Sequence, residues 1–427
     1  MDILNASDKD FRKRLAAITS RGEADTSKVE DAVKEIITGI RRHGDKALFS
    51  YTNRFDGLLL DKKTIRVSDA EFAGARKAVS KDIVESLKLA AKRIEAFHRR
   101  QLEKSWFFHE DDGVTLGQMV RPLERVGAYV PGGKATYPSS VLMNVIPAKV
   151  AGVKEVIVCS PTPGGEINPY VLVAAEIAGA DAVYKVGGAQ AVAAMAYGTP
   201  SIPRVDKIVG PGNIYVATAK RLVFGVVDID MIAGPSEILV VADESANPAF
   251  IAADLLSQAE HDEMASSILV TTSKKIADET IKELGKQLRK LSRKEIAEKS
   301  LNTYGAVIFV NNLDEAAAIV NEIAPEHLEL SVDRPFELLP KIKNAGAIFL
   351  GHFTPEAVGD YVAGPNHTLP TGGTARFFSP LSATDFLKRS SILFYSEAAL
   401  KKIGRDAVRI AEAEGLSAHA NSVKIRM

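Results

Sequence analysis

The stretch Gly127-Ala128-Tyr129-Val130-Pro131-Gly132-Gly133 marks a change in the pattern of the chain. A short apolar run, typical of a strand, is followed here by a glycine-rich turn, and beyond it short apolar runs alternate with helical segments. The predicted strand and helix pairs are 156–159 with 170–178, 182–186 with 189–196, and 207–209 with 214–222. This alternation predicts parallel strands joined by crossover helices.

A second series of strands and helices begins at the apolar run 237–241. This run follows the turn-like Ala233-Gly234-Pro235-Ser236 and precedes a helix that carries Gln258 and His261. Further strands are predicted at 267–271, 306–310 and 345–350, with helices at 275–291 and 313–323 between them. We therefore expect an α/β fold with two Rossmann-like but incomplete parallel-sheet lobes.

The remaining regions of the chain are predicted to form helices and one long loop. Amphipathic helices are predicted at 29–40, 70–79, 83–97 and 398–413. A loop that includes 366–373 is longer than an ordinary connection, and such loops are usually functional. The predicted organisation is a helical N-terminal arm (1–24), a discontinuous first lobe (25–129 plus 238–380), a second lobe (130–237) and a small C-terminal helical tail (381–427).

Composition excludes several classes of function. Lys+Arg and Asp+Glu both number 54, so the chain lacks the basic footprint of nucleic-acid binding, and a small-molecule partner is expected. No uninterrupted apolar stretch approaches about 20 residues. The N-terminal residues also lack a basic region followed by an apolar run. Both features predict a cytoplasmic protein without a membrane partner. Cys159 is the single cysteine, which excludes an internal disulfide and a cysteine-based zinc site. It closes an apolar run and is predicted to be a buried strand residue.

The helix that follows 237–241 carries polar side chains on its inward face. Asn247 and Pro248 form a typical helix start, and Ile251 and Leu255 recur at helical spacing. Gln258 and His261 follow on the same face as an i,i+3 pair. Such a pair usually satisfies itself and nearby backbone, and it can alternatively supply ligands to a metal ion.

Two glycine-containing turns open helices without matching the G-x-G-x-x-G dinucleotide pattern. Gly210-Pro211-Gly212-Asn213-Ile214-Tyr215 has tyrosine at the third glycine position, and Gly187-Gly188-Ala189-Gln190 lacks the spacing. Both turns expose backbone N–H groups at a helix start, where a phosphate can bind. Ordinary strand-to-helix turns explain them equally well.

Glu326 and His327 place a carboxylate beside an imidazole just before the predicted strand 328–332. Adjacent strand residues point to opposite faces, but Pro325 favours an irregular backbone that can turn both groups towards one cleft. Two bases of different strength suit separate proton transfers at neutral pH. A solvated surface dipeptide is the simpler alternative.

Asp360 and His419 extend the group of polar candidates. Together with Gln258 and His261 they form a nitrogen and oxygen set that suits zinc, although glutamine is an unusual member. Sequence spacing alone does not bring together residues spread from 258 to 419, and His367 is a competing ligand.

Taken in order, these stretches resemble the L-histidinol dehydrogenase family. The resemblance rests on residues 127–133 and on Val186-Gly187-Gly188-Ala189-Gln190-Ala191, Gly210-Pro211-Gly212-Asn213, Ile229-Asp230-Met231-Ile232-Ala233-Gly234-Pro235-Ser236-Glu237, Ser257-Gln258-Ala259-Glu260-His261, Ala324-Pro325-Glu326-His327-Leu328, Gly359-Asp360-Tyr361 and Gly364-Pro365-Asn366-His367. Each motif is weak alone, but their order over nearly the whole chain is specific.

The resemblance implies an activity and a set of site residues. It implies oxidation of L-histidinol to L-histidine through histidinal, the end of histidine biosynthesis, with two NAD⁺ reduced in succession. It implies one zinc ion per subunit, which positions the substrate, in a homodimer with shared active sites. By resemblance, zinc binds Gln258, His261 and Asp360, together with His419 from the C-terminal tail of the other subunit.

The resemblance also assigns roles to other side chains. His327 is expected to accept protons and Glu326 to activate water. The implied substrate-binding residues are Ser236, Gln258, His261, His327, Asp360, Glu414 and His419, and the implied NAD contacts are Tyr129, Gln190 and Asn213. Two other functions remain open on the residues alone: a zinc hydrolase in which Glu326 activates metal-bound water, and a non-catalytic protein that binds an imidazole or a nucleotide.

Overall fold

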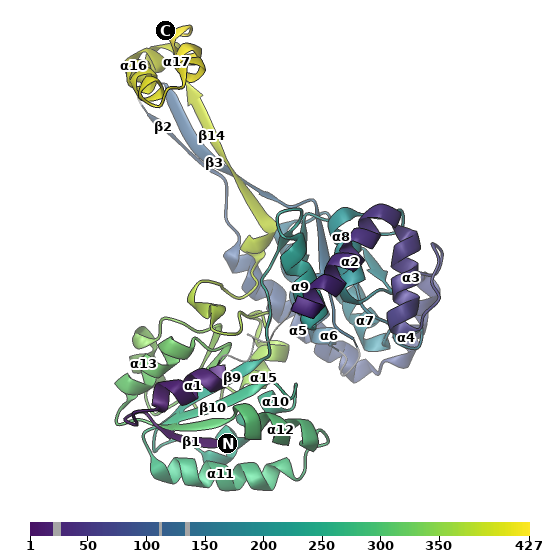
Figure 1. The fold of residues 1–427 in the computed structure, drawn as a ribbon, viewed down its shortest axis with the longest axis vertical. Helices are drawn as coiled ribbons and strands as arrows, with labels where there is room; N and C mark the ends of the chain where they lie inside the picture. The colour runs from purple at the N-terminus through teal and green to yellow at the C-terminus, as the bar shows by residue number, and fades with distance from the viewer. Residues whose placement is uncertain (20–26, 111–112, 133–136) are drawn as a thin grey trace.

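The computed structural model describes residues 1–19, 27–110, 113–132 and 137–427. Two α/β lobes lie side by side, and a narrow antiparallel arm projects from them and ends in two helices (Figure 1). The predicted α/β fold with two parallel-sheet lobes is confirmed. Among the described residues, no helix combines the length and the apolar character needed to cross a membrane.

The first lobe in chain order is built on a five-stranded parallel sheet. Its strand order is β6 (Ala182–Tyr184), β5 (Glu155–Cys159), β4 (Arg125–Tyr129), β7 (Lys207–Val209), β8 (Asp228–Ile229). The connecting helices are α6 (Pro138–Ala151), α7 (Pro169–Ala178), α8 (Gly188–Tyr197) and α9 (Ile214–Val223). After β4 the chain adds β5 and β6 on one side of it, and then β7 and β8 on the other side. The strand order therefore reverses next to β4. Open α/β sheets bind ligands at the carboxyl edge beside such a reversal.

The second lobe contains a six-stranded parallel sheet. Its order is β1 (Asp2–Asn5), β11 (Ala306–Phe309), β10 (Ser266–Thr271), β9 (Glu237–Ala242), β12 (His327–Ser331), β13 (Ala347–Leu350). Its helices are α1 (Phe11–Thr19), α10 (Pro248–Ala259), α11 (Lys274–Leu288), α12 (Lys294–Tyr304), α13 (Leu313–Ile323), α14 (Pro335–Leu338) and α15 (Glu356–Val358), and the π-helical turn η3 (Gly359–Ala363) follows α15.

The N-terminal segment belongs to this six-stranded lobe and does not form a separate helical arm. β1 pairs in parallel with β11, and Phe11, Leu15 and Ile18 of α1 are buried in one apolar cluster of this lobe. Leu4 shares that cluster, so the segment is fixed by burial of apolar side chains. Residues 20–24 of the predicted arm lie outside the described residues.

The helices α2 (Ser27–His43), α3 (Asp45–Asp56), α4 (Asp69–Ala78) and α5 (Lys81–His98) cover the five-stranded lobe. α2 packs against α8 and α9, α4 against α7, and α5 against α6 (Figure 1). The sequence predicted that 25–129 belong to the same lobe as 238–380. In the structure, residues 27–101 instead pack on the five-stranded sheet, and β4 is the central strand of that sheet. An amphipathic pattern shows which face of a helix is buried, but it does not show which sheet covers that face.

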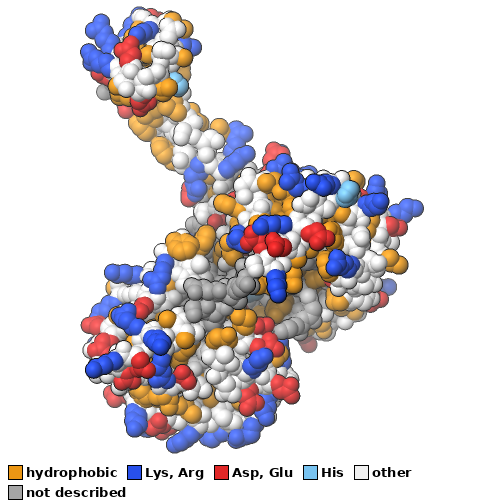
Figure 2. Space-filling model, in the orientation of Figure 1, with side chains coloured by type: hydrophobic (Ala, Val, Ile, Leu, Met, Phe, Trp, Pro, Cys, Tyr) orange, Lys and Arg blue, Asp and Glu red, His pale blue; other side chains and the backbone are white. Residues whose placement is uncertain are grey.

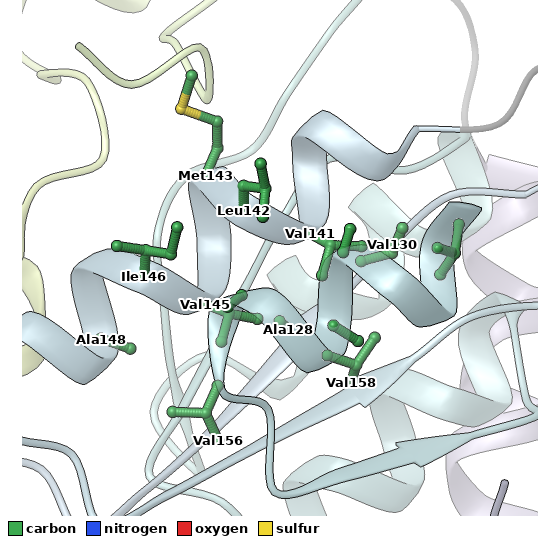
Figure 3. Packing of buried hydrophobic residues seen from close by; sticks show 14 of the residues in the cluster. Ala128, Val130, Val141, Leu142, Met143, Val145, Ile146, Ala148, Val156 and Val158 are labelled. Carbon is green, nitrogen blue, oxygen red and sulfur yellow. The ribbon is translucent and has the colours of Figure 1, made fainter. Parts of the chain in front are cut away.

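Helix α6 is buried over most of its length at the centre of this lobe. Figure 3 shows its Val141 and Val145 among side chains of the sheet such as Ala128, Val156 and Val158. On other sides it contacts α5, α7 and the short turn η5 (Ala383–Phe386). Because most of its side chains are buried, its apolar residues lie all around the helix and not on one face.

The arm is a three-stranded antiparallel sheet of β14 (Leu387–Tyr395), β3 (Val114–Pro122) and β2 (Trp106–Glu110). Large apolar side chains project from it into solvent, among them Trp106, Phe107, Leu393 and Phe394, each more than half exposed. Figure 2 shows hydrophobic side chains along the arm. At its tip stand α16 (Glu397–Ala413) and α17 (Ser417–Lys424). An exposed apolar surface of this extent marks an interaction site.

Candidate active site

Glu326 and His327 lie at the amino end of β12, where the backbone is irregular. Ala324 ends α13 in the left-handed region, with φ 53°, and Pro325 follows it. That conformation costs a non-glycine residue about 1–2 kcal/mol, so the surrounding fold must impose it. Both side chains are buried, and Glu326 Oε2 lies 3.7 Å from His327 Nδ1. The alternative of a solvated surface dipeptide is therefore wrong.

The backbone of Glu237, the first residue of β9, orients both groups. Its N–H donates to Glu326 Oε2 at 2.8 Å, and its carbonyl lies 3.0 Å from His327 Nδ1. Since a carbonyl only accepts, Nδ1 carries the hydrogen, and Nε2 is directed into the site. Nε2 lies 3.6 Å from Asp360 Oδ1, without a hydrogen-bond partner among the described residues.

The buried charges shift the pKa values of this group. Burial raises the pKa of Glu326 to about 8, although the neighbouring His327 opposes the shift. Burial alone would lower the pKa of His327, but the carboxylates of Glu356, Glu326 and Asp360 outweigh it and raise that pKa well above its usual value. The site therefore holds groups that exchange protons near neutral pH.

Gln258 lies in the last turn of α10 and His261 just beyond the end of that helix, and their side chains do not form a hydrogen bond with each other. With its amide nitrogen facing Glu356, Gln258 donates to Glu356 Oε1 at 2.7 Å and to Oε2 at 3.2 Å. Its amide oxygen is thereby directed away from that carboxylate. His261 Nδ1 is buried with no hydrogen-bond partner within the described parts of the chain.

Asp360 lies in η3, close enough to His327 and His261 to affect their protonation. Burial would raise the pKa of Asp360, but its contact with His327 and the charges of His367 and His261 produce a net lowering. Burial lowers the pKa of His261, which therefore stays neutral at pH 7. A carboxylate and a neutral imidazole with a free nitrogen are the forms in which these side chains bind metals.

Two overlapping sets of side chains could hold a metal ion. One ligand atom each from His327, Glu356 and Asp360 lies within 4.8 Å of the others. The alternative set comprises Gln258, His261 and Asp360. His327 is directed by the Glu237 carbonyl and lies beside Glu326, with which it forms the proton-transfer pair, whereas His261 is neutral and its Nδ1 has no hydrogen-bond partner among the described residues. The donor chemistry therefore fits zinc better at Gln258, His261 and Asp360.

Glu356 is a central residue of the site that sequence reasoning missed. Besides binding the Gln258 amide, it accepts a hydrogen bond from the Ser257 hydroxyl at 3.3 Å and lies 3.8 Å from His327 Nδ1. Burial raises its pKa to about 7. Its N–H donates to Glu329 Oε1 at 2.9 Å, which fixes the start of α15. The only sequence signal was its i,i+4 spacing from Asp360.

His367 supports Asp360 and does not act as a free ligand. Its Nδ1 donates to the Asp360 carbonyl at 3.0 Å, and its Nε2 lies 3.3 Å from the Ser140 hydroxyl, so both ring nitrogens are engaged. Ser140 belongs to α6 of the other lobe. This contact joins the helix that follows β4 to the turn that carries Asp360.

Of the other predicted substrate contacts, one lies beside this site and two lie far from it. Ser236 is half-buried and directly precedes Glu237 at the start of β9. Glu414 and His419 are exposed residues of the C-terminal helical tip, at the far end of the arm (Figure 1). Within one chain the structure does not bring these two residues to α10 and β12.

The three predicted NAD contacts lie at the carboxyl edge of the five-stranded sheet. Tyr129 ends β4, and its hydroxyl accepts the Gly188 N–H at 3.1 Å at the start of α8. Gln190 is in the first turn of α8, and Asn213 caps α9 by accepting the N–H groups of Tyr215 and Val216. Two helix starts thus meet next to the reversal of strand order, an arrangement suited to a nucleotide's phosphates.

Comparison with known proteins gives a consistent result. A family model described as histidinol dehydrogenase matches residues 19–427. Histidinol dehydrogenase of Geobacter sulfurreducens is 60% identical over 428 residues, covering 100% of both chains, and that of Aquifex aeolicus is 55% identical over 423 residues, covering 99% of this chain and 98% of the other. The crystal structure of histidinol dehydrogenase from Elizabethkingia anophelis superposes with a TM-score of 0.94 at 40% identity, covering 100% of this chain and 98% of that one.

Proposed function

The chain belongs to the histidinol dehydrogenase family, and on that premise we propose that it oxidises L-histidinol to L-histidine through histidinal, with two NAD⁺ reduced in succession. The observation that carries the proposal is the buried Glu326–His327 pair, held by the backbone of Glu237 beside Asp360. It supplies two proton acceptors at one place, as a two-step oxidation of an alcohol to a carboxylate requires.

His327 is the proposed proton acceptor in the first oxidation. NAD⁺, when bound, would accept the hydride of the carbinol carbon. The hydroxyl proton passes to Nε2 of neutral His327, which leaves the aldehyde. Glu326 and Glu356, with pKa values of about 8 and about 7, are suited to exchange that proton with His327. Asp360 stabilises the imidazolium that forms.

Glu326 is the proposed base for the water that enters the second step. Its Oε2 is held by the Glu237 N–H, and its other oxygen takes a proton from water as the water adds to the aldehyde carbon. The resulting diol anion would give its hydride to a second NAD⁺, and its remaining hydroxyl proton passes to His327. Histidinol, two NAD⁺ and one water thereby become histidine, two NADH and three protons.

We propose that zinc is held by Gln258, His261 and Asp360, with a fourth ligand, His419, from a second copy of the chain. When bound, the ion would fix the imidazole and amino groups of the substrate. This set is supported by His261 Nδ1, which lacks a hydrogen-bond partner among the described residues, and by the Gln258 oxygen, which is turned away from Glu356. The exposed apolar arm that carries His419 and Glu414 away from their own lobes supports a homodimer with shared sites.

A direct assay tests the activity. Purified protein given histidinol and excess NAD⁺ should form two NADH for each histidine, measured by nicotinamide absorbance and by chromatography of the product. One NADH with release of histidinal would contradict the two-step proposal. Substrate turnover without NAD⁺ would favour a zinc hydrolase instead.

Replacement of Glu356 by Gln is expected to weaken zinc binding by roughly 10–100-fold, the usual effect of losing a group that orients a metal ligand. Gln retains only one acceptor oxygen for the Gln258 amide, so the amide is less well oriented. Zinc affinity is measured by competition with a chelator. Glu337→Gln, on the exposed α14, is the control, and equal affinities for both variants would remove Glu356 from this role.

A further inference from the structure

Lys220 and Asp230 form a buried ion pair that neither the proposed chemistry nor the predicted NAD contacts involve. Lys220 belongs to α9, and Asp230 directly follows β8. Their side chains are 2% and 1% exposed, and the Lys220 ammonium contacts Asp230 Oδ1. Burying two charges carries a desolvation cost, so a pair of this kind requires further hydrogen bonds that compensate for it.

Those hydrogen bonds converge on Gly210, the first residue of the turn that leads to Asn213. The Gly210 N–H donates to Asp230 Oδ2 at 2.7 Å, and Lys220 Nζ donates to the Gly210 carbonyl at 2.9 Å. Gly210 has φ +107°, and a Cβ there would lie 2.1 Å from the Tyr129 carbonyl oxygen. The two ends of one ion pair thus hold both polar backbone groups of a glycine that no other residue can replace without displacement.

Asp230 also holds the segment that crosses to the other lobe. Its Oδ1 accepts the Met231 N–H at 2.7 Å, and the Met231 side chain is buried. Residues 231–236 then lead into β9, whose first residue, Glu237, orients Glu326 and His327. One carboxylate therefore contacts both the turn before α9 and the covalent connection to β9, whose first residue orients Glu326 and His327.

We propose that Lys220 and Asp230 are positioning residues that fix the Gly210–Asn213 turn for dinucleotide binding and tie that turn to the crossing segment ahead of Ser236. This inference rests on the proposed function, since it takes NAD as the ligand of the turn. The pair sets the affinity for the cofactor through the backbone of Gly210 and contacts neither histidinol nor the metal ligands. Loss of hydrogen bonds from charged groups to the turn is expected to weaken dinucleotide binding by roughly 10–100-fold.

The test uses the double variant Lys220→Met/Asp230→Asn, which removes both charges at similar volume and leaves no unpaired buried charge. Calorimetry should show NADH binding weakened by roughly 10–100-fold. In assays, KM for NAD⁺ should rise by a similar factor, while KM for histidinol and the zinc content stay at wild-type values. A merely structural role would instead lower the melting temperature without this selective effect.

The control is Lys207→Met/Asp228→Asn, which removes a neighbouring ion pair with N–O distance 2.8 Å that does not hold Gly210. Wild-type NADH affinity in the Lys220/Asp230 double variant, or an equal loss in the control, would overturn the inference. If this double variant does not fold, Lys220→Gln/Asp230→Asn, which keeps neutral hydrogen-bonding groups and leaves no unpaired charge, carries the same calorimetric comparison. Wild-type protein that binds NADH without oxidising histidinol would contradict the proposed function but leave this binding test intact.

Discussion

Replacement of His327 by Asn is expected to lower kcat by about 10²–10⁴-fold, the usual contribution of a positioned general base. The Asn amide nitrogen can take the place of Nδ1 and donate to the Glu237 carbonyl, so the local backbone should keep its conformation. No atom then remains at the position of Nε2, and the alcohol proton has no acceptor. Steady-state kinetics with saturating histidinol and NAD⁺ give the measurement.

His352→Asn provides the matched control for this substitution. His352 follows β13 at the carboxyl end of the strands, whereas His327 lies at their amino end. Its Nδ1 lies 2.9 Å from the Ser331 hydroxyl and its Nε2 lies 3.2 Å from the Ser245 hydroxyl. Its loss should leave kcat within about twofold of wild type, since surface substitutions usually have small effects. If His327→Asn matches this control, His327 is not the base.

Replacement of His419 by Ala is expected to lower activity by at least 10–100-fold, because loss of a metal ligand should cost no less than loss of a group that orients one. The residue is exposed in a single chain, so its removal should leave the fold and melting temperature of each subunit unchanged. Zinc content per chain should fall together with activity. Wild-type zinc content in this variant would exclude His419 from the metal site.

The strands and helices of both lobes were largely predictable because their side-chain patterns are local. The apolar run at 237–241 is confirmed as β9 (Glu237–Ala242). The helix expected to carry Gln258 and His261 is α10 (Pro248–Ala259), which contains Gln258 but ends two residues before His261. The arm was not predicted. Its strands face solvent on both sides, so they lack an alternating apolar pattern, and β14 pairs with residues more than 200 positions earlier in the sequence.

The candidate site was predictable where motifs are contiguous and unpredictable where burial alone gives a residue its role. Glu326 and His327 stand out as adjacent ionisable residues before a strand. Glu356 looks like any surface glutamate in sequence, and it becomes important because η3 and α10 enclose it. Lys220 likewise lies in an amphipathic helix, and only the fold brings Asp230 and Gly210 to it.

The central claim is that each active site combines Gln258, His261, Asp360 and His327 of one chain with His419 of another. Mixing the inactive variants His327→Asn and His419→Ala, with exchange of subunits, tests it most directly. Random pairing places one variant of each kind in half of the dimers, and each such dimer regains one intact site out of two. The account predicts recovery of about one quarter of wild-type activity. A mixture that stays as inactive as its two components, with mixed dimers demonstrated by affinity tags, would contradict it.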